Sequence, residues 1–142
     1  MLRFCLHSHE NEMLQESIIA TKGYRYFRPH KHSAGKNKTY HLLKGEILIV
    51  IFDNKGKVKK RVILSDKKNG NIIFRLKSNT YSNLIPITRT TIWHEVCIGP
   101  FSKGKKFLTY LKNSPSNDSN RRECLDYSSK ISKVDLKSRF KE

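Results

Sequence analysis

The sequence predicts an all-β fold built as a small antiparallel barrel. Short segments in which apolar and polar residues alternate recur along the chain, and alternation with a period of two is typical of strands with one buried face. Residues that favour turns separate these segments, and no long helical period interrupts them before residue 113. Short strands at short intervals are typical of an antiparallel barrel or sandwich.

The first predicted strands lead to a pair of histidines. Residues 2–9 alternate apolar and polar side chains, and residues 15–21 form a second extended segment that ends beside Gly23. His30 and His32 follow, one residue apart. Side chains at positions i and i+2 of a strand project from the same face, so the two imidazoles are expected to point together into the barrel.

The later strands surround the clearest turn in the chain. Ile47–Phe52 is the longest apolar run and is expected to be a strand, and Asp53–Gly56 is a strong hairpin signal. Residues 57–64 then return as the partner strand. Further strands are expected at 39–43, 72–76, 84–87, 90–98 and 107–111.

The composition divides the chain into a barrel and a polar extension. With 142 residues the chain is long enough to bury one core, which we place in residues 1–112. From residue 113 the composition shifts to Ser, Asn and Asp, which predicts a linker followed by a basic tail. Within residues 113–142, Cys124–Phe140 has the spacing of a weak amphipathic helix, expected to be loosely packed and flexible.

The charge of the chain suggests an anionic partner without specifying one. The formal net charge is +17, but basic residues are spread over the whole sequence. Nucleic acid is therefore not the expected partner, because phosphate contacts require a focused patch. The three cysteines have no CxxC spacing, which argues against a disulfide framework and a zinc ribbon. No signal peptide or membrane span is evident, so a cytoplasmic protein is expected.

Six short motifs follow one another along residues 2–115. They are RFCLH at Arg3–His7, QE at Gln15-Glu16, RPHKH at Arg28–His32, HLLKGE at His41–Glu46, FDNKGKV at Phe52–Val58 and GPF at Gly99–Phe101. Taken together they resemble the WbuC-type cupin fold metalloproteins, found among bacterial O-antigen and capsule biosynthesis functions. The resemblance implies a small antiparallel cupin (jelly-roll) barrel with a polar, flexible C-terminal extension.

The resemblance also implies a divalent transition metal held by two histidines, a glutamate and a later histidine. His30 and His32 match the first two ligands, whereas Lys38 stands at the glutamate position and Ser82 at the later histidine. The metal motif is thus degenerate, and a cation at a ligand position opposes metal capture. Glu95 is the first candidate to replace the missing ligand, so the hypothesis is either a metal of unknown identity on His30, His32 and Glu95, or none.

A pocket for a small polar ligand, such as a sugar or nucleotide sugar, is the leading functional hypothesis. Either histidine would suit acid/base chemistry near neutral pH, and Lys38 would stabilise a developing anion. Whether the protein is an enzyme stays open, and no catalytic residue is assigned. The expected pocket residues are Gln15, Arg28, His30, His32, Lys38, Tyr40 and Ser82.

A second hypothesis is a non-enzymatic barrel whose metal site has decayed and whose basic surface binds an anionic partner. A homodimer is an expectation at the level of the family. The sequence has no Ser-His-Asp order, P-loop or GxGxxG motif, so it gives no support to hydrolase, kinase or dehydrogenase activities.

Overall fold

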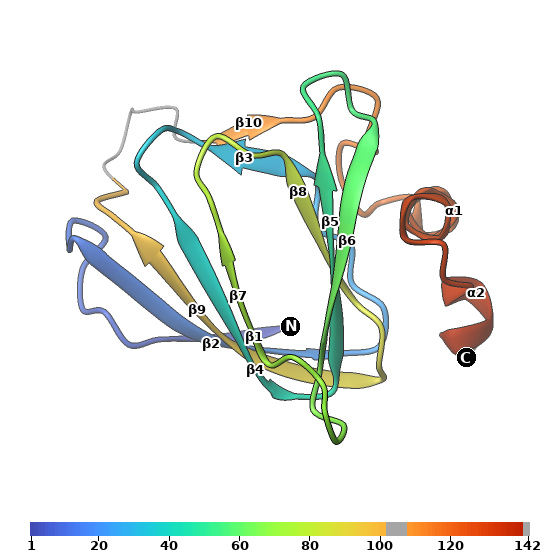
Figure 1. Cartoon of the computed structure of the whole chain (residues 1–142), viewed down its shortest axis with the longest axis horizontal. Coiled ribbons are helices and arrows are strands. Elements are labelled where there is room, and N and C mark those ends of the chain that lie inside the picture. The colour runs from blue at the N-terminus through green and yellow to red at the C-terminus, as the bar shows by residue number, and fades with distance from the viewer. Residues whose placement is uncertain (102–107, 141–142) are drawn as a thin grey trace.

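The computed structural model describes residues 1–101 and 108–140. In this part of the chain, two five-stranded antiparallel sheets face each other (Figure 1). The first sheet has the order β1 (Leu2–Cys5), β2 (Leu14–Lys22), β9 (Thr90–Ile98), β4 (Lys38–Lys44) and β7 (Ile73–Leu76). The second has the order β10 (Leu108–Tyr110), β3 (His30–His32), β8 (Ser82–Pro86), β5 (Glu46–Phe52) and β6 (Val58–Ser65). The predicted all-β antiparallel fold is confirmed.

An apolar core joins the two sheets. In the first sheet Trp93 of β9 pairs in register with Ile19 of β2 and with Leu42 of β4, so these side chains form one row on the inner face. All three are almost completely buried. The other buried members of this cluster are Tyr40, Ile47, Ile49, Leu64, Leu76 and Leu84, which come from both sheets.

The inner face of the first sheet becomes more polar further along β9. Glu95 pairs with Tyr40 of β4, and Cys97 pairs with Lys38. Because strand side chains alternate between faces, Trp93, Glu95 and Cys97 all point inward. The register therefore places a carboxylate and an ammonium group next to the apolar core, on neighbouring strands.

The strand β5 is buried on both of its faces. Ile47 and Ile49 belong to the core between the sheets, whereas Leu48, Val50 and Phe52 belong to a second cluster on the other face. A strand with two buried faces has a continuous apolar run instead of an alternating one. That explains the longest apolar run of the sequence.

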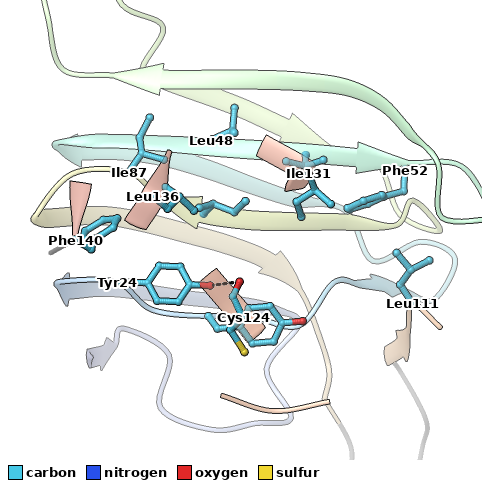
Figure 2. Packing of buried hydrophobic residues seen from close by; sticks show 12 residues of the cluster. Tyr24, Leu48, Phe52, Ile87, Leu111, Cys124, Ile131, Leu136 and Phe140 are labelled. Atoms are coloured by element: carbon cyan, nitrogen blue, oxygen red, sulfur yellow. Dashed lines mark hydrogen bonds between the residues drawn. The ribbon is translucent and has the colours of Figure 1, made fainter. Parts of the chain in front are cut away.

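The C-terminal segment covers the outer face of β5. It contains α1 (Arg121–Ser132) and α2 (Leu136–Arg139), which lie beside β5 and β6 in Figure 1. Figure 2 shows the side chains that this segment buries there: Cys124 and Ile131 of α1, Leu136 of α2, and Phe140 directly after α2. Neither helix, within the described residues, has the length and apolar character needed to cross a membrane.

The helical segment is held more firmly than the sequence suggested. The Asn120 side chain caps α1 by accepting a hydrogen bond from the Glu123 amide at 3.1 Å. The Tyr24 hydroxyl donates to the Cys124 carbonyl at 2.8 Å, the contact drawn in Figure 2. The expected helix is present. The expectation of loose packing was wrong for residues 121–140, because their apolar side chains are buried against the outer apolar side chains of β5.

We predict that this packing contributes substantially to stability. Leu136 is 0% exposed, so Leu136→Ala should lower the free energy of unfolding by about 2–5 kcal/mol through lost burial and a residual cavity. Leu2, which is 77% exposed, is the matched control, and Leu2→Ala should change it by about 0.5 kcal/mol or less. Urea unfolding measures both. Equal small effects would show that the helices do not belong to the cooperative core.

Candidate functional site

A cavity of about 320 Å³ lies between the two sheets. Its polar lining consists of Arg3, His30, His32, Lys38, Ser82 and Glu95. The rings of Phe27, Tyr40, Trp93 and Phe101 and the apolar or weakly polar side chains of Ile19, Leu84, Cys97 and Leu108 complete it. The cavity therefore combines aromatic walls with a small number of polar groups, as ligand pockets commonly do.

The two histidines lie side by side on β3. Their ring centroids are 5.2 Å apart and the ring planes are inclined by 55°. His30 also pairs in register with Ser82 of β8, so the residue at the expected position of the later histidine lies opposite the first one. The structure thus brings His30, His32, Lys38, Tyr40, Ser82 and Glu95 to one cavity.

The hydrogen bonds of His30 define its tautomer. Its Nδ1 lies 2.8 Å from the backbone carbonyl of Arg28. A carbonyl oxygen only accepts, so Nδ1 carries the proton. Burial, and secondarily the charge of Lys38, lower the pKa of His30 below its usual value, which keeps the ring neutral. Its Nε2 consequently carries a lone pair that can accept a hydrogen bond or a proton.

His32 is buried without a partner for either ring nitrogen among the described residues. It is 7% exposed, and burial, followed by the charge of Lys38 and then His30, lowers its pKa to about 3. The Nε1 of Trp93 is likewise buried without a hydrogen-bond partner there. Buried polar atoms without partners cost stability, so they mark positions where a ligand or water would be favourable.

Lys38 and Glu95 form a buried ion pair beside the histidines. The Lys38 Nζ lies 3.4 Å from the Glu95 Oε1, and their side chains are 8% and 13% exposed. Burial alone lowers the pKa of Lys38, but the Tyr40 hydroxyl and the Glu95 carboxylate raise it, and the net direction is upward. Burial also raises the pKa of Tyr40 to about 12. Lys38 is therefore an ammonium group at neutral pH.

These residues do not form a conventional metal site. No group of three or more His, Cys, Asp or Glu residues is placed to hold a metal ion in residues 1–101 and 108–140. Glu95, the candidate third ligand, is already paired with Lys38, and both histidines have the Lys38 ammonium as a neighbour that lowers their pKa. A divalent cation here would face a fixed positive charge, so the donor set does not fit one.

Two predicted pocket residues lie elsewhere. The Gln15 amide donates to the carbonyls of His9 and Glu12, so it ties down the loop between β1 and β2. The Arg28 guanidinium lies over the Tyr110 ring, 4.6 Å from its centroid. Neither side chain lines the cavity. The Gln15 side chain points inward, but Gln15 lies opposite Cys97 and next to the loop. The loop carbonyls are therefore closer hydrogen-bond partners than the groups of the cavity.

Sequence reasoning did not place Arg3, Phe27 or Phe101 in the site. Arg3 pairs in register with Ile19, so it lies on the inner face of β1. The period of two gave the opposite signal, because alternation places the apolar Leu2 and Phe4 inward, whereas they are 77% and 67% exposed and Arg3 faces the cavity. Phe27 and Phe101 lie outside the described strands, where alternation gives no information.

Comparisons with known proteins support the fold. A family model described as a domain of unknown function, DUF6016, matches residues 2–64. No curated protein matches the sequence. Among solved structures, the capsular polysaccharide assembling protein CapF from Staphylococcus aureus is 11% identical with a TM-score of 0.60, covering 77% of this chain and 29% of the CapF chain.

Two further structures are explicitly cupins. The cupin domain of Cnp3 from Schizosaccharomyces pombe is 11% identical with a TM-score of 0.52, covering 68% of this chain and 59% of that one. A cupin superfamily protein from Desulfitobacterium hafniense DCB-2 is 12% identical with a TM-score of 0.53, covering 68% of this chain and 75% of that chain. At these identities the likeness shows the fold alone. The predicted cupin barrel is confirmed, and membership of the WbuC-type family stays a prediction.

The buried histidines should make stability depend on pH. Between pH 7.5 and 5.5 the unfolded chain takes up a proton at His32, whose ordinary pKa is about 6.5, whereas the folded chain rejects it until about pH 3. The stability that the neutral His32 contributes is therefore present above pH 6.5 and is lost on acidification. Between pH 7.5 and 5.5, His32 alone should lower the free energy of unfolding by about 1.3 kcal/mol. The lowered pKa of His30 acts in the same direction.

Urea unfolding of His32→Gln at both pH values isolates this contribution. In the variant, the difference in unfolding free energy between pH 7.5 and pH 5.5 should be smaller by about 1.3 kcal/mol. His9→Gln, at an exposed position, is the control and should keep the whole of it. An unchanged pH dependence in His32→Gln would mean that His32 is not held neutral in the fold.

Proposed function

We propose that this protein binds a sugar-like small molecule in the cavity between its sheets, without a resident metal. The observation that carries the proposal is His32, which is buried in the cavity lining with both ring nitrogens unpartnered among the described residues. The Nε1 of Trp93, on the opposite sheet, supports it in the same way. A ligand, or water, that both donates and accepts hydrogen bonds would satisfy these atoms.

The walls of the cavity fit such a ligand. Hydroxyl groups donate and accept, which matches a neutral imidazole and an indole N–H. The aromatic side chains of Phe27, Tyr40, Trp93 and Phe101 offer apolar surface for the C–H groups of a sugar ring. Neutral histidines and a paired ammonium–carboxylate couple leave a site that does not depend on a metal to orient the ligand.

The same groups suit proton transfer on the bound ligand. The Nε2 of His30 has a lone pair and would act as the base, since its Nδ1 proton is directed to the Arg28 carbonyl. The Lys38 ammonium, close enough to lower the pKa of both histidines, would stabilise the negative charge left on the ligand. This is the chemistry we propose if the protein is an enzyme.

We place the protein in, or as derived from, bacterial surface polysaccharide biosynthesis. The support is the resemblance of its motifs to the WbuC-type family and the likeness of its fold to CapF, a capsular polysaccharide assembling protein. Because this chain spans 29% of the CapF chain, the activity of the whole CapF protein is not carried over. The alternative, an anionic partner bound by the basic surface, has the net charge of +17 in its favour.

Thermal unfolding of tag-free protein with a panel of monosaccharides and nucleotide sugars tests the proposal. A ligand present at one hundred times its Kd should stabilise the fold by about 2.7 kcal/mol, which raises the Tm by several degrees. His32→Gln should abolish the shift, and His9→Gln, at an exposed position outside the cavity, should retain it.

Other results would contradict the proposal in distinguishable ways. A Tm shift that survives in His32→Gln would place the ligand elsewhere. One equivalent of transition metal, lost in a His30→Ala/His32→Ala double variant, would identify a metalloprotein. Salt-dependent retention on polyanions, without any Tm shift from sugars, would favour the basic surface as the functional feature.

A further inference from the structure

Three charged side chains line the cavity, and their charges do not cancel. They are Arg3, Lys38 and Glu95, and both histidines of the lining are held neutral by their lowered pKa values. The described lining therefore has two positive charges and one negative charge. An uncharged ligand would leave one positive charge uncompensated.

The excess positive charge is that of Arg3. Lys38 and Glu95 are both buried and only 3.4 Å apart, so they neutralise each other first. Arg3 is further away, with its Nη2 at 4.0 Å from the Glu95 Oε1, and its side chain is 46% exposed. That distance exceeds the 2.7–3.2 Å of a normal hydrogen bond. Among the described residues no other polar contact is formed by the guanidinium, which leaves most of its five N–H groups available.

The strand β1 directs this cation toward the cavity. Arg3 faces inward, while Leu2 and Phe4, on either side of it, are 77% and 67% exposed. The edge strand thus turns its charged residue inward and its apolar residues outward, opposite to the usual arrangement. An inward charge can protect a sheet edge from pairing with another chain, so ligand binding must be tested separately from aggregation.

The cavity volume limits the size of the ligand. About 320 Å³ is near the lower end of the range of about 300–1,000 Å³ for small-molecule pockets. That volume suits one substituted sugar ring better than a complete nucleotide sugar. A guanidinium binds carboxylate and phosphate groups through two parallel hydrogen bonds, so either group would satisfy Arg3.

Building on the proposed function, we infer that the ligand is a monosaccharide with one anionic group and that Arg3 selects it. The aromatic walls and His32 hold the sugar ring, and the guanidinium of Arg3 binds the anionic substituent. The Lys38–Glu95 pair stays intact when the ligand binds. Arg3 is a specificity-determining residue and has no role in chemistry on the ring.

Calorimetric titration with matched sugars tests this inference. The probes are glucose, glucuronate and glucose 6-phosphate, together with the corresponding galactose series. At least one anionic sugar should bind tenfold or more tightly than its neutral parent, and comparison of the two anionic forms distinguishes carboxylate from phosphate. Arg3→Gln should remove the preference without weakening the neutral sugar, and Arg3→Lys should restore part of it.

The control variant is Lys22→Gln, which removes an exposed cation outside the cavity lining and should leave the preference unchanged. Neutral and anionic sugars that bind equally well would overturn the inference and leave the proposed function standing, as would a preference that survives in Arg3→Gln. If no sugar of either series binds to the folded protein, the proposed function fails, and the inference fails with it.

Discussion

The buried ion pair between Lys38 and Glu95 determines the character of the cavity. Two opposite charges taken out of water are tolerated only when they compensate each other, so each residue requires the other. The pair occupies neighbouring strands of the first sheet, beside the phenol of Tyr40. Burial, and secondarily its ammonium group, keeps His30 and His32 neutral, and its carboxylate is already paired with that ammonium. The consequence is a pocket whose neutral imidazoles can form hydrogen bonds with a ligand.

Much of this arrangement was predictable from periodicity. The i, i+2 spacing of His30 and His32 predicted that they share a face, whereas the positions of Lys38 and Ser82 near them were implied by the resemblance to the WbuC-type family. The pairing of Glu95 with Lys38 was not predictable, because it depends on the register between β4 and β9, which the sequence does not encode locally. The same limit explains Gln15, whose inward position was foreseen but whose hydrogen bonds to the loop carbonyls were not.

The C-terminal helices illustrate a different limit. Their composition is polar enough to suggest a loosely packed tail, because only a few of their residues are apolar. The signal for tight packing lies in another segment, the continuous apolar run of β5, because a strand of this kind is buried on both of its faces. The apolar run Ile47–Phe52 predicts a strand, but it does not indicate that Leu136 and Phe140 cover the second buried face of that strand. Reading the two segments together would have predicted the packing.

A double-mutant cycle on Lys38→Met and Glu95→Gln tests the central claim most directly. Glu95→Gln leaves a buried ammonium group without its carboxylate and should cost about 3–5 kcal/mol of unfolding free energy. The double variant should cost clearly less than the sum of the two single variants, with a coupling energy between about 0.5 and 3 kcal/mol. Additive effects in urea unfolding would contradict the account, because they would mean that the two charges do not stabilise each other in the fold.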